Sequence, residues 1–220
     1  MPEAAGDEST GIEVAASLWS VPAERQHAAA AELADHGLRR MHWDMTDGRF
    51  ARAGGFSADG ARELSAGLGL AAEAHIMARS SSREVDAWTD FCDLVIVHAE
   101  SADWQKAVDR IVRRGCEPGL ALSAMTPASV VPEGMTALCM SITPGEAGSA
   151  FDPAVIDKIR ALRESSDRRV GVDGGVTRDI AARVADAGAS WVAVGNDLVG
   201  TGGLQRWADL LRGRRARTGS

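Results

Sequence analysis

The chain has 220 residues, of which 45% are hydrophobic and 25% are charged, and its formal net charge is -7 at pH 7. This length and hydrophobic content suffice for one sizeable core, which excludes a peptide scaffold and argues against a multidomain assembly. The negative charge repels phosphate backbones and anionic headgroups, so neither nucleic acid nor a membrane surface is an expected partner.

The sequence carries no sign of export. No apolar run approaches the ~20 residues that a membrane-spanning helix needs, and the N-terminus has no basic-then-apolar signal pattern. The three cysteines, Cys92, Cys116 and Cys139, form no CxxC pair and are odd in number, so we expect buried thiols and no disulfide framework. These features predict a cytoplasmic protein.

Eight short β-type runs alternate with Ala-rich helical stretches along the chain. The runs occupy residues 12–17, 38–44, 70–77, 93–100, 119–123, 137–142, 169–173 and 190–195. Helical patterns cover 23–37, 102–115, 152–166 and 177–188, with weaker patterns at 57–67 and 128–134. Gly37, Gly115 and Gly188 end three of the helical stretches, where a left-handed residue would stop the helix.

Strict alternation of strands and helices predicts a parallel sheet, because parallel strands need long crossovers. Eight such units favour closure into an α/β (β/α)8 TIM barrel. A doubly wound open sheet is the alternative, although no GxGxxG follows the first strand. We expect one barrel domain over 12–212, between a flexible N-terminal segment, 1–11, and a flexible basic tail, 213–220.

Four titratable side chains fall at or near the carboxyl ends of predicted strands, where barrels of this kind place reacting groups. His42 and Asp44 are two residues apart, so the pleat puts both on one face; His75 and Asp173 come near the ends of two further strands. Two imidazoles and two carboxylates at one barrel mouth would suit one divalent ion, Zn²⁺, Fe²⁺ or Mn²⁺.

Each of the four residues also has a structural interpretation. A single histidine at a strand end is often hydrogen-bonded in the core, and Asp44 and Asp173 could cap turns. Taken together they favour a shared ion, because an unpaired carboxylate facing a barrel interior costs several kcal/mol.

Glycine-rich turns follow the last two predicted strands, at 173–175 and 195–196. Barrels commonly bind phosphate there, because bare backbone exposes N–H donors. As isolated motifs these turns are weak, and their position in the topology is what favours a phosphate site. A third Gly/Pro loop, 143–149, is long enough to act as a lid.

The ordered motifs resemble those of ribulose-phosphate 3-epimerases over about residues 12 to 200. The matching blocks are ASLWS (16–20), HWDMTDGRF (42–50), AHIM (74–77), HAE (98–100), MSITPG (140–145) and VDGGV (172–176). The resemblance implies a barrel of the ribulose-phosphate-binding type. It also implies an isomerase that inverts C3 of a ketose phosphate, typically D-ribulose 5-phosphate to D-xylulose 5-phosphate.

Carried onto the matching positions, the resemblance implies that His42, Asp44, His75 and Asp173 hold the metal. Asp44 and Asp173 would also act as the two acid/base groups on opposite faces of a metal-stabilised enediolate. Ser17 would hydrogen-bond near the reacting centre, so it joins the two aspartates as a catalytic candidate.

The resemblance also implies a set of substrate-binding positions. They are Ser17, Met77, Met140, Gly145, Gly148, Gly174, Gly175, Gly195 and Asn196. The methionines would pack against the enediolate and the glycines and Asn196 would contact the phosphate. Methionine in a β-run is also ordinary core filler, so that second interpretation stays open.

The chain departs from the family pattern in the loops that would face the substrate. Thr46 stands where the family usually has Met, and the lid carries Glu146 and Ser149 in place of an aromatic residue and glutamine. Trp19 and Trp43 add bulk beside the first two motifs. These differences suggest a ketose phosphate other than, or in addition to, ribulose 5-phosphate.

Two other functions remain open from the sequence. The same enediolate could serve an isomerase or lyase reaction on a related sugar phosphate, or the barrel could bind a phosphosugar without turnover. In every case the expected partner is a small sugar phosphate. Barrels of this type often form homo-oligomers, although no heptad or exposed apolar stripe identifies an interface.

Overall fold

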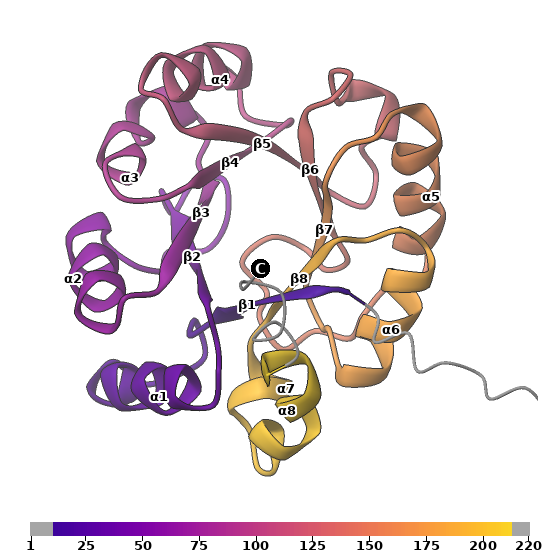
Figure 1. Ribbon diagram of the computed structural model, residues 1–220. Helices are drawn as coiled ribbons and strands as arrows, with labels where there is room; N and C mark the ends of the chain where they lie inside the picture. Colours follow the sequence, from indigo (N-terminus) through magenta and orange to yellow (C-terminus); the bar gives the residue numbers. More distant parts are fainter. Residues whose placement is uncertain (1–10, 213–220) are drawn as a thin grey trace, which may run out of the picture.

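The computed structural model describes residues 11–212, and these form a closed barrel of parallel strands ringed by helices (Figure 1). The strands are β1 (Glu13–Ser17), β2 (Arg40–Thr46), β3 (Ala71–Met77), β4 (Leu94–His98), β5 (Glu117–Leu122), β6 (Thr136–Met140), β7 (Val170–Asp173) and β8 (Trp191–Val194). They pair in chain order, and β1 closes the barrel on β8. Each predicted β-run overlaps one strand, so the (β/α)8 prediction is confirmed and the open sheet is excluded.

The connections between strands carry the helices of the outer ring. The helices are α1 (Ala23–Asp35), α2 (Ala58–Leu68), η1 (Ser81–Arg83), α3 (Asp86–Thr89), α4 (Trp104–Arg113), η2 (Ala128–Val130), α5 (Val155–Ser165), α6 (Arg178–Asp186), α7 (Asn196–Val199) and α8 (Gly203–Arg212). Gly37, Gly115 and Gly188 have φ of 106°, 78° and 105°, which confirms the predicted left-handed stops. The predicted flexible ends, except for Gly11, lie outside the described residues.

The prediction of a helix over 128–134 is wrong. Only the single turn η2 forms there, followed by an extended residue at Val131. Pro127 and Pro132 flank this turn, and a proline has no N–H with which to continue a helical hydrogen-bond pattern.

Apolar side chains fill two regions, one inside the barrel and one between the strands and the helices. The inner group contains Leu94, Ile96, Leu138, Met140 and Trp191. Trp191 is wholly buried and occupies the space that Gly171 leaves free, since a Cβ on Gly171 would lie 2.2 Å from the indole ring. The barrel is therefore a packed core rather than a pore, and a site can open only at its rim.

No helix within residues 11–212 is long and apolar enough to cross a membrane.

Candidate active site

A cavity of about 580 Å³ opens among the residues at the carboxyl ends of the strands. Every predicted site residue lines this cavity except His42 and His75, which are fully buried. The lining residues that were predicted are Ser17, Asp44, Met77, Met140, Gly145, Gly148, Asp173, Gly174, Gly175, Gly195 and Asn196. The two carboxylates are thus open to a ligand, whereas the two imidazoles are not.

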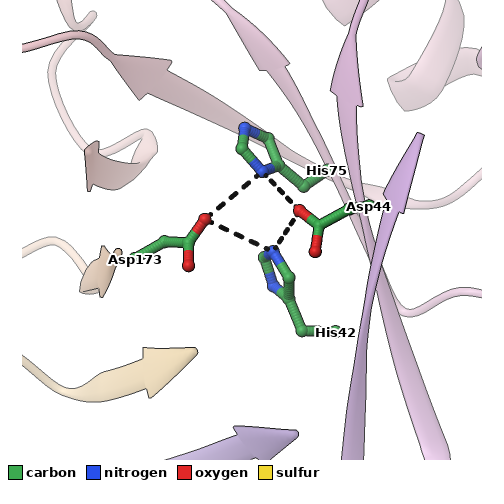
Figure 2. A group of neighbouring side chains, drawn as sticks. All are labelled: His42, Asp44, His75 and Asp173. Atoms are coloured by element: carbon green, nitrogen blue, oxygen red, sulfur yellow. Dashed lines mark hydrogen bonds and ion pairs between the residues drawn. The ribbon is translucent and has the colours of Figure 1, made fainter. Parts of the chain in front are cut away.

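Strand register explains why the four titratable residues meet. Asp44 on β2 is the direct neighbour of His75 on β3, and His42 is the neighbour of Ser17 on β1. Asp173 ends β7 and reaches the same point from another part of the barrel wall (Figure 2). Two-residue spacing puts His42 and Asp44 on one face, the β2–β3 register adds His75, and closure of the barrel brings in Asp173 from β7.

The four ligand atoms lie around one point, as Figure 2 shows. Asp44 Oδ1 is 3.2 Å from His42 Nε2 and 3.1 Å from His75 Nδ1. Asp173 Oδ2 is 3.9 Å from His42 Nε2 and 3.6 Å from His75 Nδ1. The ligand atoms of a tetrahedral Zn²⁺ site with bonds of 2.0–2.2 Å would be about 3.4 Å apart. The observed spacing therefore fits a single divalent ion.

The imidazole of His42 gives an independent reason for a cation at this point. Its Nδ1–H donates to Glu73 Oε1 at 2.7 Å, and Trp191 Nε1–H donates to the same oxygen at 3.1 Å. If the imidazole is neutral, this leaves Nε2 without a proton, and Nε2 is buried with no hydrogen-bond partner among the described residues. A lone pair that faces Asp44 and Asp173 is unfavourable unless a cation or a proton lies between them.

His75 is supported by two further polar side chains. Its Nε2 lies 2.9 Å from His98 Nε2, and His98 Nδ1 lies 3.0 Å from Glu100 Oε2. Glu73, His98 and Glu100, which contact the two imidazoles directly or through one another, are residues to which the sequence analysis gave no role. A signal for Glu73 existed, because it lies two residues before His75, on the same face of β3, whereas Glu100 follows the end of β4 in a turn that no strand spacing identifies.

The two imidazoles have different proton affinities. Burial disfavours a charged His42, but Asp44, Glu73 and Asp173 outweigh it and hold the pKa of His42 well above its usual value. Burial lowers the pKa of His75, and the hydrogen bond to Asp44 compensates only in part. In the metal-free protein, His42 is therefore the group that carries a proton where the ion would sit.

The pKa values of the two aspartates are shifted in opposite directions. Burial opposes ionisation of Asp44, but His42 and His75 outweigh it and hold the pKa of Asp44 below its usual range. Ser17 Oγ also donates to Asp44 Oδ2 at 2.9 Å. Burial, together with the charge of Asp44, raises the pKa of Asp173. A carboxyl pair whose pKa values diverge in this way suits one base and one acid.

Glycine-rich backbone forms another side of the cavity. Gly174 and Gly175 have φ of 106° and 59°, and the end of the lid loop packs directly on Gly175. A Cβ on Gly175 would lie 2.6 Å from the backbone nitrogen of Phe151. Gly195 and Asn196 line the cavity at the start of α7. Only residues without side chains allow the two loops to approach so closely.

The departures from the family pattern are divided between the cavity wall and its surroundings. Trp19 and Ser149 line the cavity, whereas Glu146 is exposed and does not. Thr46 Oγ1 donates to Ala51 O and so holds its own loop together. Trp43, which belongs to β2, is buried and does not line the cavity. Among these departures, Trp19 and Ser149 are therefore the ones that can contact a bound substrate, and Glu146 is not.

One cationic side chain that the sequence analysis did not single out lines the cavity. Arg206 on α8 donates to Asp197 Oδ1 at 3.1 Å and to Thr201 O at 2.9 Å. Asp197 also accepts from Trp207 Nε1–H at 2.8 Å. The guanidinium is thus held at the rim next to Asn196 by its own neighbours.

The chain is similar to known proteins in sequence and in fold. A model of the "Ribulose-phosphate 3 epimerase family" matches residues 13–199. The "Ribulose-phosphate 3-epimerase" of Synechocystis sp. is 29% identical over 86% of this chain and 87% of its own length. The protein of the same name from Bacillus subtilis is 25% identical, over 92% and 99%. A mutant tryptophan synthase α-subunit from Pyrococcus furiosus has a TM-score of 0.63 at 15% identity, covering 92% of this chain and 98% of its own, and shares the fold.

Proposed function

This chain belongs to the ribulose-phosphate 3-epimerase family, and on that premise we propose that it is a 3-epimerase that depends on one divalent metal ion. It is a carbohydrate isomerase of the epimerase class, and its substrate is a sugar phosphate. The candidate substrate to test first is D-ribulose 5-phosphate, which would be converted to D-xylulose 5-phosphate. Longer ketose phosphates come next, because Trp19 and Ser149 alter the cavity wall.

One observation carries the proposal. Asp44 and Asp173 are the two acids that both line the cavity and reach the point shared with His42 and His75. A group in that position can touch a bound substrate on one side and a cation on the other. Epimerisation needs two such groups, since the proton is removed from one face of the carbon and returned to the other.

His42, Asp44, His75 and Asp173 would hold the ion, and Zn²⁺, Fe²⁺ and Mn²⁺ all accept this mixture of imidazole and carboxylate. When bound, the ion would supply positive charge that stabilises the negative charge of an enediolate. His42 and His75 would contribute to its binding from behind the cavity wall, out of reach of the substrate.

The aspartates would share the proton transfer at C3. Asp44 is the group held in the charged form, and the Ser17 hydroxyl fixes its Oδ2. Asp173 keeps a proton more readily, so it can deliver one from its own side of the site. For the reverse reaction the two roles exchange. Met77 and Met140 lie on the cavity wall and would exclude water from the carbanion-like carbon.

The glycine-rich side would bind the phosphate. Gly174, Gly175, Gly195 and Asn196 offer backbone N–H groups with no bulky side chain in the way. Gly145 and Gly148 belong to the loop that covers them, which would close over the substrate. With the phosphate held there, the ketose carbons would extend toward the two aspartates.

Isotope exchange tests this function directly. The metal-loaded protein is incubated in D₂O with D-ribulose 5-phosphate and, separately, with ketose phosphates of six and seven carbons. We expect deuterium at C3 together with the C3 epimer as product and the carbonyl unmoved. A product with a shifted carbonyl or a cleaved chain would indicate isomerase or lyase chemistry. No exchange with any ketose phosphate would contradict the proposal.

A further inference from the structure

A hydrogen-bonded series of three side chains, His75, His98 and Glu100, leads away from the proposed metal site. His75 Nε2 lies 2.9 Å from His98 Nε2, and the two ring planes are inclined by 30° with 4.9 Å between their centroids. His98 Nδ1 lies 3.0 Å from Glu100 Oε2. Both histidines are completely buried, and the Glu100 side chain is 28% exposed. The series therefore connects the centre of the barrel mouth with its edge.

The hydrogen-bond capacity of each group fixes the order of the protons when Nδ1 of His75 binds a cation. A neutral imidazole carries one proton, so His75 must then hold it on Nε2 and needs an acceptor there. His98 can accept at Nε2 only if its own proton is on Nδ1. That proton in turn needs an acceptor, and Glu100 Oε2 is the atom that faces it. The carboxylate ends the series because it accepts without having to donate.

The outer end of the series is itself fixed. Glu100 Oε1 accepts from the backbone N–H of Ser123 at 2.9 Å and from the hydroxyl of Thr126. The Phe50 ring packs against His98 with 4.6 Å between ring centroids. Neither His98 nor Glu100 can therefore turn without breaking contacts on a second side. These contacts make the pair a rigid support for the His75 ring.

His42 has a shorter support of the same kind, because Glu73 accepts its Nδ1 proton directly. The two imidazoles thus present opposite ring nitrogens to the centre, Nε2 in His42 and Nδ1 in His75. Each is backed by a carboxylate, one directly and the other through a second imidazole. Such outer groups orient metal-bound histidines and raise their basicity.

We propose that His98 and Glu100 are positioning residues for the metal site: they accept the Nε2 proton of His75 and so hold its Nδ1 toward Asp44 and Asp173. The inference rests on the proposed metal dependence. It assigns to His98 and Glu100 a role in binding the ion, although neither residue touches the ion or the substrate.

The substitution Glu100→Gln tests the proton order. Its amide oxygen can keep the contacts to Ser123 and Thr126, which leaves the NH₂ group facing His98 Nδ1. His98 must then accept at Nδ1 and carry its proton on Nε2, where it meets the Nε2 proton of a metal-bound His75. Two donors would face each other, and relief requires the His75 proton on Nδ1, where the cation should bind.

The experiment measures binding of Co²⁺ alone to the metal-free full-length protein. We expect Glu100→Gln and His98→Phe to weaken the affinity about 10- to 100-fold. His98→Gln should bind nearly as well as the unaltered protein, because an amide oxygen can again accept the proton of His75. Glu117→Gln is the matched control, since Glu117 lies at the amino-terminal end of β5 and also accepts from a threonine hydroxyl. It should leave the affinity unchanged.

A second measurement separates positioning from a general loss of structure. In the ¹⁵N-labelled, zinc-loaded protein, NMR should show slowly exchanging imidazole protons on His75 Nε2 and His98 Nδ1. The His75 signal should persist in His98→Gln and be lost in His98→Phe, with both variants folded by circular dichroism. If the unaltered protein bound Co²⁺ tightly and Glu100→Gln bound it equally well, the positioning role would be overturned. If the unaltered protein bound none, the proposed function itself would fail.

Discussion

Three acidic side chains surround His42: Glu73 lies beside Nδ1, and Asp44 and Asp173 lie beside Nε2. This arrangement makes metal binding depend on pH. Its pKa is well above the usual value, and an ion can bind only after that proton leaves. Affinity should therefore rise with pH, up to about tenfold per pH unit for the one proton displaced. If His42 had an ordinary pKa near 6.5, the metal affinity would level off soon above that pH.

Competition with a chelator measures how the metal affinity depends on pH. The range from about pH 6 to pH 9 includes the ordinary pKa of histidine. We expect the apparent affinity for Zn²⁺ still to be rising at the upper end. In Glu73→Gln the plateau should begin at lower pH, because one of the acids that raises the pKa of His42 is removed. A plateau that begins at neutral pH in the unaltered protein would show that His42 carries no such proton.

The roles of the two aspartates can be separated by measuring which exchange of the C3 proton remains when one aspartate is replaced by asparagine. Asp173→Asn should slow inversion at C3 by about 10²- to 10⁴-fold, because one acid/base group is missing. Asp44 would remain, so the C3 proton of one of the two epimers should still exchange with D₂O. The measurement is NMR of both epimers in D₂O at saturating Zn²⁺, with bound metal determined in parallel. Equal exchange of both epimers would contradict the assignment of one group to each face.

The sequence predicts the four candidate metal ligands more fully than their surroundings, and the reason is geometric. Strand ends and two-residue spacing place His42, Asp44, His75 and Asp173 at the barrel mouth without any knowledge of register. The roles of Glu73 and His98 depend on which residue of one strand lies beside which residue of the next. His42 is paired with Glu73 through the β2–β3 register, and no local pattern in the chain fixes that pairing.

At the level of elements, the turn after β7 and the lid loop depend on each other. Gly175 has φ of 59°, and a Cβ there would lie 2.6 Å from Phe151 N and 2.8 Å from Ser149 O. Gly175→Ala should therefore displace the loop and raise KM for the sugar phosphate, in addition to a cost of about 1–2 kcal/mol for the left-handed backbone. Steady-state kinetics and urea unfolding measure the two effects.

Gly69→Ala provides the comparison. Gly69 ends α2 with φ of 62°, and no atom lies within 4 Å of a Cβ built there. It should lose a similar amount of stability from the backbone alone and leave KM unchanged. If both variants raised KM equally, contact between the turn and the lid would not control substrate binding.

Strands were easier to predict than helices because each strand is a short apolar run between polar turns. The helices of the ring vary in length, from α1 with 13 residues to α3 with four. The segment 128–134 shows the limit of pattern reasoning, since its apolar residues allowed a helix and its flanking prolines prevented one. Departures at the lid, such as Glu146, could be noted in the sequence, but whether they face the cavity depends on the loop conformation.

For the whole molecule, closure of the barrel depends on how its interior is filled. Trp191 is fully buried inside, and a Cβ on Gly171 would lie 2.2 Å from its ring. Gly171→Ala should lower the free energy of unfolding by about 1–3 kcal/mol through overpacking. Urea denaturation measures the loss.

A glycine on the outer ring should respond in the opposite direction. Gly67 lies within α2 with no atom within 4 Å of a built Cβ, so Gly67→Ala should stabilise the protein by about 0.5–1 kcal/mol. If Gly171→Ala were as stable as Gly67→Ala, the interior would be looser than the packing around Trp191 indicates. The alternation of eight strands predicted closure, but it gave no indication that one tryptophan fills the space beside Gly171.

In the proposed reaction, one divalent ion, held by His42, Asp44, His75 and Asp173, is required for inversion at C3. The most direct test is to add Zn²⁺ in small steps to the metal-free protein and to follow the conversion of D-ribulose 5-phosphate to D-xylulose 5-phosphate. We predict no turnover without metal, a linear rise with added ion and a plateau at one equivalent per chain. Full turnover by the metal-free protein, or a plateau at another stoichiometry, would contradict the account.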